Sequence, residues 1–209
     1  MRLRITFAKT REMRYTSHLD LYRTWERTLR RAKLPLAYSQ GYNPHPKINL
    51  ASALPLGFTS QNEVMDVWLD EDLPSKQVEQ ALQAAAPPGL VIQQVEPVDE
   101  RLPTLQTVLE ASDYSITFLE PVERLDERVK ALLAAEELPR ERRGKPYDLR
   151  PLILELRCMP DDEQGNQRLF ARLRAQEGAT GRPEEVIDAI GALVEATRVH
   201  RTGLVFSHP

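Results

Sequence analysis

Residues 2–33 have the sequence RLRITFAKTREMRYTSHLDLYRTWERTLRRAK, within which the spacing of the apolar residues changes. Over 2–9 apolar and polar residues alternate, which is typical of a strand with one buried face. Over 18–33 apolar residues recur at helical spacing, after Ser17 as the N-terminal cap and before Pro35 as the stop. This stretch therefore predicts a strand followed by an amphipathic helix.

The two kinds of spacing continue along the rest of the chain. Further strands are predicted at 47–54, 63–70, 90–98, 113–120, 151–158, 168–175 and 197–206, and further helices at 75–86, 122–132 and 183–193. Each half of the chain then has the order strand, helix, strand, strand, helix, strand. This is the order of a split βαβ, or ferredoxin-like, unit.

The predicted fold class is therefore α+β, with two tandem ferredoxin-like (βαββαβ) domains that have antiparallel sheets. The N-terminal domain is predicted to span 1–97, a connector 98–111, and the C-terminal domain 112–209. A basic insert, PRERRGKPYDLR at 139–150, interrupts the second domain. Sequence identity between the two halves is negligible, so the shared order alone does not establish a duplication.

The composition indicates a folded protein without a membrane span. Apolar residues make up 41% and charged residues 28% of the chain, which is ordinary for a soluble globular protein. No segment has the pattern of a signal peptide or a transmembrane helix, so we expect a cytoplasmic protein. The single cysteine, Cys158, excludes a disulfide framework and a multi-cysteine zinc or iron–sulfur site carried by this chain alone. We expect this thiol to be structural rather than a nucleophile.

The net charge of −3 conceals a strong asymmetry along the chain. Residues 1–50 hold eleven Lys and Arg against three acidic residues, a local balance of +8 that leaves −11 for the remaining residues. Such a distribution favours one surface that binds a polyanion or an acidic partner. The alternative is that charges cluster by chance on solvated faces.

Four arginines of the predicted helix are candidates for binding phosphate: Arg23, Arg27, Arg30 and Arg31. The first three fall within an arc of about 60° on a helical wheel, opposite the apolar stripe. A guanidinium donates two parallel hydrogen bonds and stays charged, so a row of them can follow a sugar–phosphate backbone. The alternative is a solvated face on which Asp20 and Glu26 pair with the arginines.

The segment AYSQGYNPHPKINLASALPLG at 37–57 is rich in residues that stiffen a loop. Gly41 allows backbone conformations that other residues resist, and Pro44 and Pro46 keep His45 extended. The polar groups that this loop would present to a nucleotide or to a partner protein belong to Gln40, Gly41, Asn43, His45 and Lys47. The alternative is a rigid loop that only connects a helix to a strand.

His18, Asp20 and His45 are the candidates for catalysis. Two histidines and a carboxylate can transfer protons if the loop lies beside the first turn of the helix. For His18 the alternative is a packed, hydrogen-bonded side chain. Their spacing is not a metal-site signature, so no metal site is predicted. Sequence signatures of phosphate-binding loops and nucleophile elbows are missing, and whether the chain is an enzyme is left open.

The second half contains two further basic segments. The insert at 139–150 contributes Lys145, Asp148 and Arg150 as candidates for contacting RNA, with a solvated loop as the alternative. Alternation over the strand at 168–175 groups four side chains on one face: Arg168, Phe170, Arg172 and Arg174. Cationic residues around an aromatic ring can hold single-stranded RNA, although an interface between the two domains explains them equally well.

Three blocks of the sequence resemble a known family. They are RYTSHLDLYRTWERTLRRAKLPLAYSQGYNPHPKINLASALPLG at 14–57, SQNEVMDVWL at 60–69 and KPYDLRPLI at 145–153. On these residues the chain resembles the radical-SAM-linked family of bacterial proteins of unknown function. The resemblance implies a radical-SAM protein as partner, fused or encoded nearby. SAM and an iron–sulfur cluster would then belong to that partner, because this chain lacks the CxxxCxxC motif that holds the cluster.

Three functions are consistent with these features. The leading hypothesis is an accessory RNA-binding protein that acts with a radical-SAM partner in RNA modification or ribosome-related metabolism. The second is an RNA-processing or RNA-modifying enzyme that uses His18, Asp20 and His45. The third is a protein–protein adaptor whose basic face docks on the radical-SAM protein without RNA.

Overall fold

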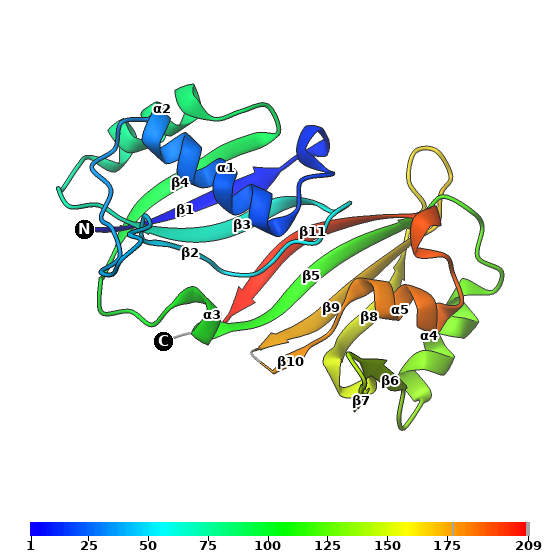
Figure 1. Cartoon of the computed structure of the whole chain (residues 1–209). Helices are drawn as coiled ribbons and strands as arrows, with labels where there is room; N and C mark the ends of the chain where they lie inside the picture. Colours follow the sequence, from blue (N-terminus) through cyan, green and yellow to red (C-terminus); the bar gives the residue numbers. More distant parts are fainter. Residues whose placement is uncertain (177, 208–209) are drawn as a thin grey trace. The chain divides into compact units, whose positions relative to one another are not determined.

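The computed structural model describes residues 1–176 and 178–207, which divide into two compact units (Figure 1). Unit 1 spans 1–109 and unit 2 spans 110–207, so the division falls inside the predicted connector. The prediction of an α+β protein with antiparallel sheets is confirmed. Within the described ranges, no helix is long and apolar enough to cross a membrane.

Unit 1 consists of a sheet covered on one face by two helices (Figure 1). Its main elements are β1 (Arg2–Lys9), α1 (His18–Arg31), β2 (Ile48–Leu50), β3 (Thr59–Trp68), α2 (Ser75–Ala85) and β4 (Leu90–Val98). Two short helices, η1 (Arg11–Met13) and α3 (Leu105–Val108), complete it. The strands lie in the order β4-β1-β3-β2, and each neighbouring pair is antiparallel.

The strand boundaries differ from the prediction where apolar spacing gives no signal. Strand β3 begins at Thr59, four residues before the predicted start, because polar residues there still pair with β1, as in the Lys9–Ser60 register. Strand β2 covers only Ile48–Leu50 of the predicted 47–54. Backbone pairing therefore extends the strands, or cuts them short, independently of which side chains are buried.

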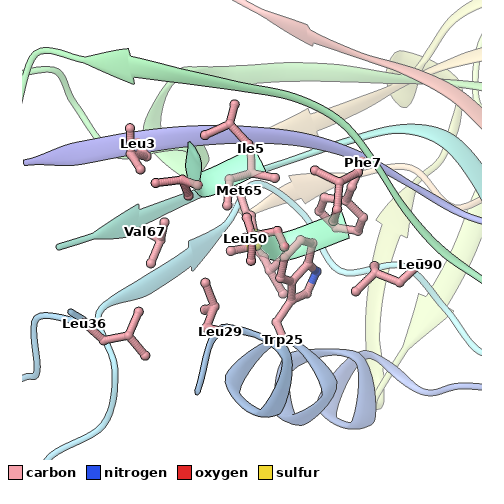
Figure 2. Packing of buried hydrophobic residues seen from close by; sticks show 14 of the residues in the cluster. Leu3, Ile5, Phe7, Trp25, Leu29, Leu36, Leu50, Met65, Val67 and Leu90 are labelled. Carbon is pink, nitrogen blue, oxygen red and sulfur yellow. The ribbon is translucent and has the colours of Figure 1, made fainter. Parts of the chain in front are cut away.

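The core of unit 1 forms where α1 docks on β1 (Figure 2). Trp25 has no exposed surface and meets the ring of Phe7 edge to face, with centroids 4.8 Å apart. Leu21 and Leu29, one turn to either side of Trp25, are also buried, as the helical spacing predicted. This packing fixes which face of α1 is turned away from the sheet.

An ion-pair cluster is buried in unit 1. Asp66 of β3 has no exposed surface and accepts hydrogen bonds from Arg2 Nε at 3.0 Å and Arg4 Nε at 2.9 Å. The Arg2 guanidinium also donates to the carbonyl oxygens of Leu102 and Pro103, at 2.6 and 3.0 Å. Arg2 therefore ties the segment after β4 to the sheet, and its charge does not reach the surface.

Unit 2 has strands β5 (Leu109–Phe118), β8 (Ile153–Met159), β9 (Arg168–Gln176), β10 (Ala179–Thr180) and β11 (Thr197–Phe206). Its helices are α4 (Leu125–Ala134) and α5 (Pro183–Ile190), with short turns η2 (Arg150–Leu152) and η3 (Val194–Ala196). Strand β9 lies between β5 and β8, and β5 also neighbours β11. The basic insert forms a hairpin of its own, β6 (Pro139–Arg142) and β7 (Lys145–Asp148).

The four side chains predicted on one face of β9 already have partners within unit 2. Arg172 pairs with Asp113 through two hydrogen bonds of 2.7 and 2.8 Å, and Phe170 lies 4.5 Å below the guanidinium of Arg157. Arg168 donates to the Pro160 carbonyl, and Arg174 donates to Gln176. The opposite face, with Leu169, Ala171 and Leu173, is fully buried.

We predict that Asp66→Ala destabilises unit 1 by roughly 3–5 kcal/mol, because it leaves Arg2 buried without its carboxylate partner. Urea denaturation followed by circular dichroism measures the change. The control is Asp99→Ala, which removes the exposed partner of Arg101 and should cost less than about 1 kcal/mol. Equal losses in the two variants would contradict a structural role for the buried cluster.

Candidate nucleic-acid interface

Helix α1 is the element around which the candidate interface is built. Its N-terminal cap forms as predicted: Ser17 Oγ accepts a hydrogen bond from the Asp20 backbone N–H at 3.2 Å and donates to the Asp20 carboxylate at 2.7 Å. The Asp20 carboxylate is therefore hydrogen-bonded to the N-terminal cap of the helix.

The arginine ridge, which we define as Arg23, Arg27 and Arg30, is exposed to solvent along α1. Arg23 lies 3.6 Å from Asp20, and both side chains are more than half exposed. The guanidinium groups of Arg27 and Arg30 form no hydrogen bond or ion pair with any residue that the structure describes. The ridge therefore presents guanidinium groups that no protein acceptor occupies, apart from the exposed pair of Arg23 with Asp20, which contributes little energy.

Glu26 does not neutralise the ridge. Its carboxylate is mostly buried, and Oε1 lies 3.8 Å from Nδ1 of His45, on the flank of α1 that faces the loop 38–46. The pKa of Tyr22 on the same flank is raised, first by burial and then by the charge of Glu26. Of the two acids that could have paired with the arginines, only Asp20 does so.

The loop 38–46 is held at its base and exposed at its tip. Lys47 N–H donates to the Ala37 carbonyl at 2.8 Å, and Ser39 and His45 are joined by two hydrogen bonds of 2.8 and 3.1 Å. Gly41 has φ +145°, a conformation that side chains disfavour. Tyr42 beside it is fully exposed. The hydrogen bonds at the base of the loop thus hold in place the segment that carries Gly41 and Tyr42.

Each predicted polar residue of this loop is exposed: Gln40, Gly41, Asn43, His45 and Lys47. Apart from the contact between His45 and Glu26, their side chains form no interaction with the described part of the chain. Their groups remain available to a ligand.

The three candidates for catalysis do not gather in one place. His18 and Asp20 lie in the first turn of α1, whereas His45 lies beside Glu26. Glu26 is eight residues after His18, a distance of about 12 Å along the helix axis. In residues 1–176 and 178–207, no group of three His, Cys, Asp or Glu side chains could hold a metal ion. This arrangement offers no shared proton-transfer site.

The predicted residues of the insert belong to unit 2. Asp148 accepts hydrogen bonds from the backbone N–H groups of Leu138 and Arg150, at 2.7 and 2.9 Å. The Arg150 guanidinium donates to the Leu133 carbonyl at 2.8 Å, near the end of α4. Both side chains secure the local backbone, and only Lys145 projects without such a bond. Contact of these residues with RNA stays a prediction.

Cys158 has the properties of a structural thiol. Burial, followed by the nearby Asp126 carboxylate, raises its pKa to about 11. The thiol is therefore protonated at neutral pH and poorly suited to act as a nucleophile or metal ligand. A single thiol also cannot supply the four cysteine ligands of an iron–sulfur cluster.

Several solved structures match the chain at low sequence identity. A Cbf5–Nop10–Gar1 complex contains a chain with 11% identity, aligned over 97% of this chain and 47% of that one, with a TM-score of 0.48. A chain in an H/ACA RNP bound to a substrate RNA containing 2'-deoxyuridine has 12% identity over 96% and 46%, with a TM-score of 0.49. This chain thus spans about half the length of those proteins. At such identities and TM-scores the likeness carries no conclusion about function.

A protein-family model matches most of the chain. No curated protein matches the chain. The model of a family described as "Uncharacterized protein conserved in bacteria (DUF2344)" matches residues 2–183, which include α1, the loop 38–46 and the β6–β7 hairpin. Membership of a bacterial family of unknown function is thereby confirmed, whereas its link to a radical-SAM protein stays a prediction. The chain belongs to the DUF2344 family of bacterial proteins.

Proposed function

We propose that this chain is an accessory RNA-binding protein that holds a single RNA strand along α1. One observation carries the proposal: Arg27 and Arg30 are exposed and have no acceptor in the described protein, and Glu26 is turned away from them. Phosphates spaced along a strand supply the acceptors that such a row of guanidinium groups needs.

Tyr42 adds a second kind of contact to this proposal. The ring is fully exposed on a loop whose base is hydrogen-bonded and which contacts α1 through His45 and Glu26. An exposed aromatic ring beside a basic surface can stack on a base without selecting its identity. We therefore assign phosphate contacts to the ridge and base stacking to the loop.

We also propose that both units are ferredoxin-like domains. The order β4-β1-β3-β2 in unit 1 supports this, since it places the fourth strand beside the first and the second at an edge. In unit 2, β11, β5, β9 and β8 follow the same order when the β6–β7 insert and the short β10 are set aside. Fold alone does not identify the ligand, so the RNA proposal rests on the side chains.

A radical-SAM partner remains part of the proposal, on the strength of the sequence blocks at 14–57, 60–69 and 145–153. The partner would carry SAM and the iron–sulfur cluster, and this chain would present the RNA. His18, Asp20 and His45 have no assigned catalytic step in this scheme, because His45 lies beside Glu26 rather than at the first turn of α1.

We predict that Arg23→Glu combined with Arg30→Glu weakens RNA binding more than tenfold, across RNA sequences. The slope of log K against log salt should become shallower by roughly 1.4, since each lost phosphate contact on a single strand removes about 0.7. Fluorescence anisotropy with labelled single-stranded RNA at several salt concentrations measures both quantities.

The control for this variant is Arg124→Glu combined with Arg143→Glu, two exposed positions in unit 2. It changes the net charge by the same amount and should leave affinity and slope nearly unchanged. If the two double variants behave alike, binding reflects overall charge and the ridge has no specific role.

Replacing the loop tyrosine by Tyr42→Ala should lower RNA affinity by about 1–3 kcal/mol, the usual value of one stacked base. Tyr42→Phe keeps the ring and should bind like the wild type. The same anisotropy titration measures both variants. An equal loss in Tyr42→Phe would indicate that the hydroxyl, rather than stacking, makes the contact.

Recovery of the protein from its native bacterium tests the partner. We expect a polypeptide with the CxxxCxxC motif to copurify, to persist after nuclease treatment, and to persist in the Arg23→Glu and Arg30→Glu variant. Mass spectrometry identifies it. Loss of the partner in that variant would favour the adaptor hypothesis, in which the ridge docks on protein. Failure to recover such a polypeptide under any of these conditions would remove the partner from the proposal.

A further inference from the structure

A cleft of about 220 Å³ lies in unit 1 between α1 and the segment that joins α2 to β4. Its lining consists of Met13, Thr24, Arg27, Thr28, Arg31, Pro87 and Pro88. On the helical wheel Thr24 is about 160° from Glu26, so the cleft and the loop 38–46 lie on different flanks of α1. The arginine ridge runs between them.

Two guanidinium groups one helical turn apart give this cleft its charge. Arg31 is oriented by a hydrogen bond from Nη1 to the carbonyl of Ala85, the last residue of α2, at 3.0 Å. Arg27 has no acceptor among the described residues. No described residue of the lining is acidic. The cleft is therefore suited to an anion that can accept hydrogen bonds from both guanidinium groups.

The threonines of the lining do not compete with the arginines for an anion. Thr24 Oγ1 donates to the Asp20 carbonyl at 2.7 Å, and Thr28 Oγ1 donates to the Thr24 carbonyl at 2.8 Å. Their hydrogens are thus used within the helix. Hydrogen bonds to a bound anion must come from Arg27 and Arg31.

The opposite wall is apolar and firmly packed. Pro87 and Pro88 precede Gly89, whose φ is +90° and whose position is so close to Met13 that an added Cβ would lie 2.6 Å from Met13 Cγ. The Gly89 carbonyl also accepts a hydrogen bond from Thr10 N–H at 2.9 Å. Proline rings held in this way offer a flat apolar surface to a sugar or a base.

The size of the cleft limits what it can hold. At about 30 Å³ for each water molecule, its volume corresponds to roughly seven waters. Drug-sized ligands and cofactors occupy about 300–1,000 Å³. The phosphate of a nucleotide and either its sugar or its base fit this space, whereas a dinucleotide would extend beyond it.

We propose that this cleft binds one nucleotide, with its phosphate between Arg27 and Arg31 and its sugar or base against Met13, Pro87 and Pro88. This inference rests on the proposed function. In the complex with RNA, the cleft would enclose one nucleotide of the strand that the arginine ridge binds.

Isothermal titration with adenosine 5'-monophosphate tests the cleft without RNA, and adenosine serves as the probe that lacks phosphate. We expect the monophosphate to bind at least tenfold more tightly than adenosine. Arg27→Gln should abolish this difference. Arg124→Gln is the control, because Arg124 is an exposed arginine of unit 2 that lies outside both the ridge and the cleft.

A second pair of variants changes the cleft without removing an arginine. Thr24→Glu places a carboxylate beside Arg27 and should weaken binding of the monophosphate at least tenfold. Thr24→Gln introduces a side chain of nearly the same size as glutamate but without its charge. This variant should bind the monophosphate within about threefold of the wild type. If all four variants bind the monophosphate alike, or if the wild type does not distinguish it from adenosine, the inference is overturned.

The same variants distinguish this inference from the RNA proposal. If RNA binding depends on Arg23 and Arg30 but is unchanged in Thr24→Glu, the proposed function is retained. The cleft is then overturned as a nucleotide site. Binding of the monophosphate by a protein that binds no RNA would overturn the RNA proposal and support the cleft alone, as a site for a free nucleotide.

Discussion

The contact between Trp25 and Phe7 determines how α1 is rotated about its axis, and the candidate interface depends on that rotation. With Trp25 fully buried against β1, the arginine ridge must point away from the sheet. The same rotation turns Glu26 toward the loop 38–46 and Arg31 toward the end of α2. The burial of Trp25 thus determines the environment of each of these charged side chains of α1.

The position of Glu26 decides the electrostatics of this surface. A carboxylate at i+3 or i−4 from an arginine, as Glu26 is from Arg23 and Arg30, normally offers a weak local partner. Here its Oε1 lies 3.8 Å from Nδ1 of His45 and the side chain is mostly buried, so it faces the loop instead of the arginines. The ridge keeps its positive charge for this reason.

Sequence periodicity predicted the helix, its cap and its exposed arginines, because these depend on residues close together in the chain. It could not predict the Asp66 cluster or the cleft, which need contacts between distant segments. In the sequence Pro87 and Pro88 indicate only the end of a helix, whereas in the folded protein they line the cleft together with Thr24 and Arg27. The expected grouping of His18, Asp20 and His45 required the loop to meet the first turn of α1, whereas it meets the third.

The basic excess of residues 1–50 also acquires a different meaning in the folded protein. Arg2 and Arg4 pair with Asp66, Lys9 donates to the Thr16 carbonyl, and Arg14 donates to the Gly57 carbonyl. These four charges stabilise unit 1, and the seven remaining basic residues of the segment are exposed. Four of those seven lie on α1. Most of the exposed positive charge of this segment therefore lies on one helix, a distribution that suits binding to a strand of phosphates.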